Sequence, residues 1–172
     1  MPATSRLAAN RHLPVISLAL AAALAAATAA VGAAGPALGL RAPDFAPLAA
    51  AAPQIKVHLA AAIVTFLIGG VLLLGPKGTL PHRTLGWTWA ATMATTAVSS
   101  LFIREVNHGA FSFIHAISGW VIIALPAALY AARRHNVRAH RGAMTGMYVG
   151  GMFLAGGLAF LPGRILWAVF FA

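Results

Sequence analysis

The chain has 172 residues, of which 60% are hydrophobic and only 8% are charged. A water-soluble domain carries about a quarter charged residues, so this composition excludes an ordinary soluble protein and favours an all-α integral membrane protein. The net charge of +10 comes from Lys and Arg placed between apolar runs, as in membrane-protein loops, so we expect no nucleic-acid partner.

Five apolar runs are predicted to cross the lipid bilayer as a helical bundle: 13–33, 57–75, 84–103, 111–132 and 143–161. A basic tail, residues 1–12, precedes them, and residues 13–172 then form a single transmembrane domain. The first run could be a cleaved signal peptide, although its length favours a retained helix. A loop rich in Pro and Ala follows at 34–55. The residues after Pro162 are too few to span, so we expect a short interfacial or re-entrant segment.

The basic residues predict the orientation of this bundle. Eight of them, including Arg133, Arg134 and Arg141, fall on the side of the N-terminus, and four fall on the other side. The positive-inside rule then places the N-terminus in the cytoplasm of an inner-membrane protein. The segment "RRHNVRAHR" (133–141) is either a loop that sets this topology or a site for anionic lipid or phosphate.

Two histidines on the expected outer side are the candidate cofactor ligands. His58 and His115 lie near the start of the second and fourth runs, at similar depth, each with a small residue one turn further along the helix. They could be the two axial ligands of a b-type haem or could bind a metal ion, with Arg104 and Arg164 pairing with propionates. Alternatively, each histidine satisfies a backbone group at a helix end. The chain has no Cys, so a thiolate site is excluded.

Other patterns leave different functions open. Gly142, Gly146 and Gly150 are four residues apart and predict a helix-packing face, within the bundle or in a homo-oligomer or accessory complex. Hydroxyl residues along 88–100, together with Pro126, would suit a transporter or channel for a small solute or protons. No hydrolytic or transferase constellation is present, so any enzymatic role would be electron transfer.

Five segments carry a resemblance to a known family: "KGTLPHRTLGW", "SSLFIR", "FSFIHAISG", "ARRHNVRAHR" and "LPGR". Together they resemble the bacterial family of predicted membrane proteins called domain of unknown function 2306 (DUF2306), over about residues 55–172. The resemblance implies a multi-span bacterial membrane protein and does not specify an activity.

Overall fold

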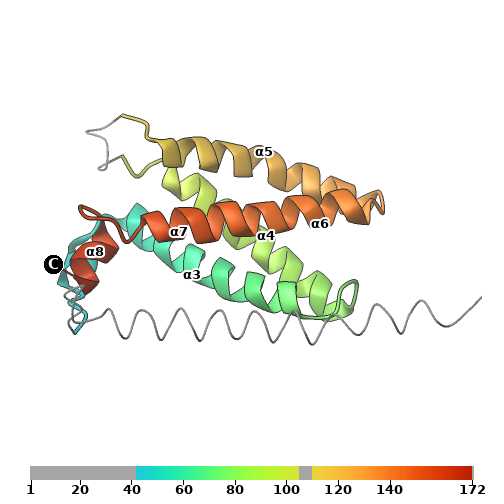
Figure 1. Ribbon diagram of the computed structural model, residues 1–172, viewed down its shortest axis with the longest axis horizontal. Helices are drawn as coiled ribbons and strands as arrows, with labels where there is room; N and C mark the ends of the chain where they lie inside the picture. Colours follow the sequence, from blue (N-terminus) through green and yellow to red (C-terminus); the bar gives the residue numbers. More distant parts are fainter. Residues whose placement is uncertain (1–41, 105–109, 172) are drawn as a thin grey trace, which may run out of the picture. The chain divides into compact units, whose positions relative to one another are not determined.

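The computed structural model describes residues 42–104 and 110–171, and this part of the chain is helical, without strands. Its long helices are α3 (Pro53–Leu74), α4 (Leu80–Ser100) and α5 (Phe113–Arg133) (Figure 1). A further helical rod consists of α6 (Val137–Gly146), the π-helical segment η2 (Met147–Leu154) and α7 (Ala155–Leu158). Two short helices, α2 (Ala46–Ala50) and α8 (Ile165–Phe170), complete the described elements.

Among the described residues, two helices are long and apolar enough to cross a membrane, α3 and α5. The expectation of five spans is therefore not confirmed. The helix α4 has 21 residues, yet its sequence contains His82, Arg83 and several Thr and Ser, which lower its hydropathy. In the rod of α6, η2 and α7, the first segment is basic and polar. The expected span 13–33 and the tail 1–12 lie outside the described residues.

The element bounds differ from the predicted ones mainly at the helix ends. Pro53 starts α3 earlier than expected, and the segment 34–55, predicted as a loop, contains α2 in its described part. Thr79 caps α4 by accepting a hydrogen bond from the His82 N–H, which moves that start to Leu80. Each helix has a proline in its first turn, Pro53 in α3 and Pro81 in α4. Proline is favourable there because the N–H groups of the first turn have no partner inside the helix, so nothing is lost when one is missing.

The turn between α5 and α6 explains why the rod begins at Val137. His135 has a positive φ of 56°, and Asn136 then caps α6 by accepting a hydrogen bond from the Ala139 N–H (3.1 Å). His140 ties the two helices together by donating from Nδ1 to the Ala128 carbonyl (3.0 Å). The basic segment 133–141 is therefore a tight helix–turn–helix, and the chain reverses direction within it.

The four long elements form a closed ring. The helix α3 packs on α4, α4 on α5, α5 on α6 and η2, and η2 returns to α3. In such a ring α3 and α5 lie opposite each other, as Figure 1 shows. The core between them comes from α4, α5 and η2, and consists of Trp89, Ala90, Met93, Ala97, Val121, Leu125, Ala128, Met147, Tyr148 and Met152.

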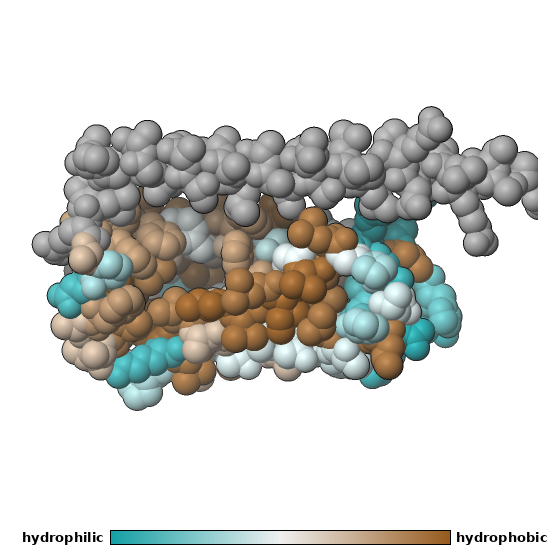
Figure 2. Space-filling model, turned by 90° about the horizontal axis from the view of Figure 1, so that it is seen from below, coloured by the Kyte–Doolittle hydropathy of each residue, from teal (hydrophilic) through white to brown (hydrophobic). Residues whose placement is uncertain are grey.

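The outward faces of the bundle are apolar. Leu67 of α3 is 61% exposed and Ile123 of α5 is 75% exposed. Figure 2 shows hydrophobic residues along the middle of the bundle and hydrophilic residues towards both ends, more of them at the end that holds the α3–α4 and α5–α6 turns. A contiguous apolar surface of this kind suits contact with lipid.

The closest approaches between helices occur at glycines other than the three that the four-residue spacing predicted. A Cβ on Gly69 of α3 would lie 2.2 Å from the Tyr148 ring, and one on Gly151 would lie 2.9 Å from Met93. Gly146 and Gly150 lie beside the Trp120 ring with room for a methyl group, and Gly142 has open space. The tightest contacts inside the bundle therefore belong to Gly69 and Gly151.

Candidate functional site

A cavity of about 1090 Å³ lies at the end of the bundle where α3 and α5 begin. Its walls come from α3, α4, α5, η2 and α7, and are mostly aliphatic and aromatic. Three of the four residues predicted as cofactor-binding line it: His58, His115 and Arg164. The fold therefore brings together side chains that are more than 100 positions apart in the sequence.

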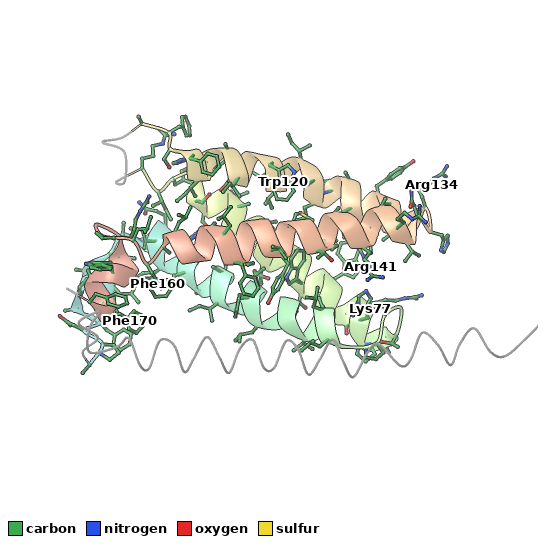
Figure 3. All side chains as sticks on the ribbon, viewed as in Figure 1. Lys77, Trp120, Arg134, Arg141, Phe160 and Phe170 are labelled. Atoms are coloured by element: carbon green, nitrogen blue, oxygen red, sulfur yellow. The ribbon has the colours of Figure 1, made fainter. Side chains whose placement is uncertain are left out.

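The short helices α2 and α8 close this end. The Asp44 N–H donates to the Val169 carbonyl (2.9 Å), which joins the segment before α2 to α8. Lys56 donates to the Ala49 carbonyl (2.6 Å) and fixes α2 to the start of α3. Phe160 and Phe170 contact each other at 6.0 Å between ring centroids (Figure 3). The expected interfacial tail is thus a helix that forms part of the cavity wall.

His58 lines the cavity, and its Nε2 carries a hydrogen-bond acceptor. Its Nδ1 lies 2.9 Å from the Thr96 carbonyl and 3.2 Å from the Ser99 hydroxyl. A carbonyl oxygen only accepts, so Nδ1 carries the proton and Nε2 keeps its lone pair. Anchoring a ring through Nδ1–H on a backbone carbonyl is the usual support for a histidine that ligates through Nε2.

His115 has the opposite arrangement. Its Nδ1 accepts a hydrogen bond from the Ser112 N–H (2.9 Å) and lies 3.1 Å from the Ser112 hydroxyl, which forms a reciprocal cap at the start of α5. In the neutral ring the proton is then on Nε2. The side chain is 8% exposed, and Nε2 has no hydrogen-bond partner among the described residues.

An unpartnered buried N–H is costly, and the Nε2 of His115 is such a group in the wall of the cavity. One turn further along α5, Ser118 shares a short hydrogen bond with Ser100 of α4. These two hydroxyls also line the cavity and join the two helices beside His115. The site therefore combines a few polar groups with an apolar wall, which is typical of ligand pockets.

Arg104 is the predicted residue that the fold does not bring to the cavity. It is exposed, its guanidinium lies 4.7 Å from the centre of the Phe111 ring, and its Nε donates to the Leu101 carbonyl (3.5 Å). Arg164, in contrast, is half-buried just before α8. Only Arg164 is placed to pair with an anionic group of a cavity ligand.

Comparison with known proteins gives the family of the chain. Residues 55–169 match the family model described as "Predicted membrane protein (DUF2306)". The chain belongs to this family. No curated protein and no solved structure was found to match it. Most of the residues that line the cavity of this DUF2306 protein lie in the matched part, and those outside it are Phe170 and residues of α2 and its flanks, between Phe45 and Ala52.

A polynuclear or protein-only metal centre has no support in residues 42–104 and 110–171. No three His, Cys, Asp or Glu side chains come together there. A metal ion at His58 and His115 alone would need further ligands from outside the protein. A haem differs in this respect, because its macrocycle supplies the other ligands of the iron.

The hydroxyl residues of α4 give little support to a solute pathway in this DUF2306 protein. Thr92 donates to the Thr88 carbonyl (3.1 Å), Thr96 to Thr92 (2.8 Å) and Ser99 to Thr95 (2.6 Å). Each hydroxyl hydrogen is thus engaged by its own helix. Thr95 is exposed, while Thr96 and Ser99 are buried, so the hydroxyl groups do not form one continuous lane.

Sequence reasoning did not identify the groups that orient the two histidines. Ser112 stands three residues before His115, the spacing of a helix-capping pair, and that signal could have been found. The partner of His58 is the backbone carbonyl of Thr96 in α4. Every residue has such a carbonyl, so the sequence does not identify the partner. The closure of the cavity by α2 and α8 was also not predicted.

Proposed function

We propose that this DUF2306 protein is a membrane redox protein that holds a b-type haem in the cavity, with His58 and His115 as axial ligands. The observation that supports this proposal is the position of the two histidines: they come from opposite helices, α3 and α5, and line one apolar cavity. Axial ligands must approach the iron from opposite faces, which opposite helices of a ring can provide.

The residues present fit this group in several respects. His58 keeps an Nε2 lone pair and is anchored through Nδ1, as described above. Arg164 supplies a positive charge for a propionate. For His115 to ligate through Nε2, its proton has to move to Nδ1, where the Ser112 hydroxyl at 3.1 Å would accept it in place of the present N–H bond. A bound haem would supply one-electron chemistry.

The proposal includes the membrane topology. We propose five spans, the three long helical elements beyond α3 and the run 13–33 included, in a bacterial inner membrane with the N-terminus in the cytoplasm. Support comes from the basic residues at the α3–α4 and α5–α6 turns, since the positive-inside rule assigns these turns to the cytoplasm. The cavity would then face the outer side.

The test is a reduced-minus-oxidised absorption spectrum of the purified protein, expressed with haem precursor supplied. We expect a b-type difference spectrum in the wild type and its loss in His58→Ala and in His115→Ala. His135→Asn is the matched control, because His135 is exposed in the α5–α6 turn and Asn tolerates its positive φ. Full haem occupancy in His115→Ala would refute the assignment of the ligands.

The positions of the ring protons of His58 and His115 favour a second candidate function, the binding of a lipid-like molecule. His58 offers an acceptor and His115 offers a donor in the same apolar cavity. A lipid-like molecule with a hydroxyl or carboxylic acid head could bind both histidines at once. In that case the purified protein is colourless, and mass spectrometry of its organic extract finds one amphiphile in the wild type that is depleted in His115→Ala. A colourless protein with no such amphiphile would refute this candidate.

We also propose that the glycine face of Gly142, Gly146 and Gly150 contacts a second copy of the chain or a membrane partner. Gly142 is exposed, and Gly146 and Gly150 are half-buried beside Trp120, so part of this face is accessible in the described part of the chain. Crosslinking in native membranes tests the proposal. A chain that stays monomeric there would contradict it.

A further inference from the structure

The end of the bundle opposite the cavity concentrates positive charge. The α3–α4 turn and the start of α4 contribute Lys77 and Arg83, and the α5–α6 turn contributes Arg133, Arg134, Arg138 and Arg141. All six side chains are exposed. Asp44 is the only carboxylate among the described residues, and its segment is bonded to α8 at the cavity end. In the described part of the chain, the charge at this end is therefore uncompensated.

Lys77 is held in a fixed position. Its ammonium donates to the carbonyls of Leu72 (2.8 Å), Leu73 (2.8 Å) and Gly75 (2.7 Å) at the carboxyl end of α3. These carbonyls have no partner within the helix, so the bonds stabilise the helix end. Lys77 thus contributes a fixed positive charge, while its three N–H groups are already engaged.

Basic side chains from other elements converge on Lys77. Burial lowers the pKa of the Lys77 ammonium, and the charge of Arg141 lowers it further. Burial also lowers the pKa of His82, which precedes the predicted span 84–103, and the nearby Lys77 and His140 add to this effect. Figure 3 shows the Arg141 side chain extending from α6 on the side of Lys77.

Arg141 has free donors in this cluster. Its guanidinium has no hydrogen-bond or ion-pair partner among the described residues, whereas Arg133 and Arg134 lie over the rings of Trp87 and Tyr130. The guanidinium fork matches the oxygens of a phosphate, and a neighbouring fixed charge strengthens such a bond. An anion bound here would offset the repulsion between the charges of Lys77 and Arg141.

We propose that Arg141 and Lys77, together with His82 and His140, form a binding site for the phosphate group of an anionic phospholipid. The surroundings favour a lipid over a free phosphate ion. Leu74 and Leu80, on either side of the α3–α4 turn, are 60% and 74% exposed, so acyl chains have apolar surface beside the cluster. A hollow of about 80 Å³ at the same turn, lined by Val71, Pro81 and His82 among others, adds to it. Basic clusters at the cytoplasmic interface attract such lipids. This inference is independent of the cavity ligand.

The experiment measures the thermal unfolding of the full chain in an uncharged detergent as short-chain phosphatidylglycerol is added. Phosphatidylcholine with the same acyl chains and inorganic phosphate are the comparison probes. We expect phosphatidylglycerol to raise the unfolding temperature and the other two probes to have little effect. Arg141→Gln should weaken the apparent affinity for phosphatidylglycerol by about tenfold or more, because a charge-assisted hydrogen bond is lost.

Arg134→Gln is the matched control, since it makes the same change of charge on an exposed residue of the neighbouring turn. It should keep nearly the wild-type affinity. Arg141→Lys keeps the charge but not the geometry of the guanidinium group, and it should bind phosphatidylglycerol with intermediate affinity. This variant allows the proposal to be tested even if Arg141→Gln does not fold. Equal losses in Arg141→Gln and Arg134→Gln would overturn the proposal, since they would indicate diffuse attraction. Inorganic phosphate acting as strongly as the lipid would overturn the choice of a lipid.

Discussion

The close approach of α3 to η2 gives a prediction whose size follows from the structure. Replacing Gly69 with Ala places a methyl group 2.2 Å and 2.4 Å from two ring carbons of Tyr148 and 2.8 Å from the indole nitrogen of Trp89. The Tyr148 ring has little freedom to move, because it is buried and its hydroxyl donates to the Phe66 carbonyl (3.0 Å). The helices must therefore separate or the ring must leave its place.

Overpacking of a core costs about 1–3 kcal/mol, and the fixed ring favours the upper half of that range. Alanine recovers about 1 kcal/mol through its higher helix propensity. We therefore expect Gly69→Ala to lower the free energy of unfolding by about 1–2 kcal/mol. Gly86→Ala is the matched control, because a Cβ on Gly86 in α4 meets no atom within 4 Å. It should raise stability by about 0.5–1 kcal/mol.

The assay is equilibrium unfolding of the purified protein in mixed micelles with a denaturing detergent. A second substitution, Tyr148→Leu, tests the mechanism, because a smaller side chain removes the two closest contacts and leaves only the one with Trp89. Gly69→Ala should then cost less than half as much in the Tyr148→Leu background as in the wild type, a coupling that contacting residues show. If Gly69→Ala is as harmless as Gly86→Ala, or if its cost is unchanged in Tyr148→Leu, the reasoning is refuted.

Three further predictions concern the ends of the bundle. Arg164→Gln should weaken retention of the cavity ligand, measured as haem or amphiphile per protein, whereas Arg104→Gln should not, because only Arg164 lines the cavity; equal effects would contradict this reading. Ser112→Ala should lower stability by about 1 kcal/mol through loss of the hydroxyl cap on α5, and Ser112→Thr, which keeps the hydroxyl, should restore most of it in the same unfolding assay. Asn136→Ala should cost about 1 kcal/mol by removing the cap of α6, while Asn136→Asp should be nearly neutral; an unchanged unfolding midpoint in Asn136→Ala would show that the cap contributes nothing.

The sequence by itself determined the class of this protein. Its low charge and long apolar runs leave too few polar residues to cover a soluble fold, and the helical class and the DUF2306 family both follow from local signals. The approximate positions of the four long helical elements were also predictable, because Pro, Gly and Asn mark their ends in the sequence. The sequence did not determine the number of spans. Such an assignment depends on hydropathy, which the polar residues of α4 and α6 lower.

Only the tertiary structure decided which residues meet. His58 and Arg164 are 106 positions apart, and their shared cavity depends on how α8 folds back against the segment before α2, a contact made by backbone groups that any sequence possesses. The tertiary structure also decided the proton positions of the two histidines. His58 carries its proton on Nδ1 because a carbonyl of α4 lies beside that atom. His115 carries its proton on Nε2 because its Nδ1 accepts a hydrogen bond from the Ser112 N–H. Periodicity places a residue on a helix face, but its hydrogen-bond partners come from neighbouring backbone whose distance and direction are set by packing.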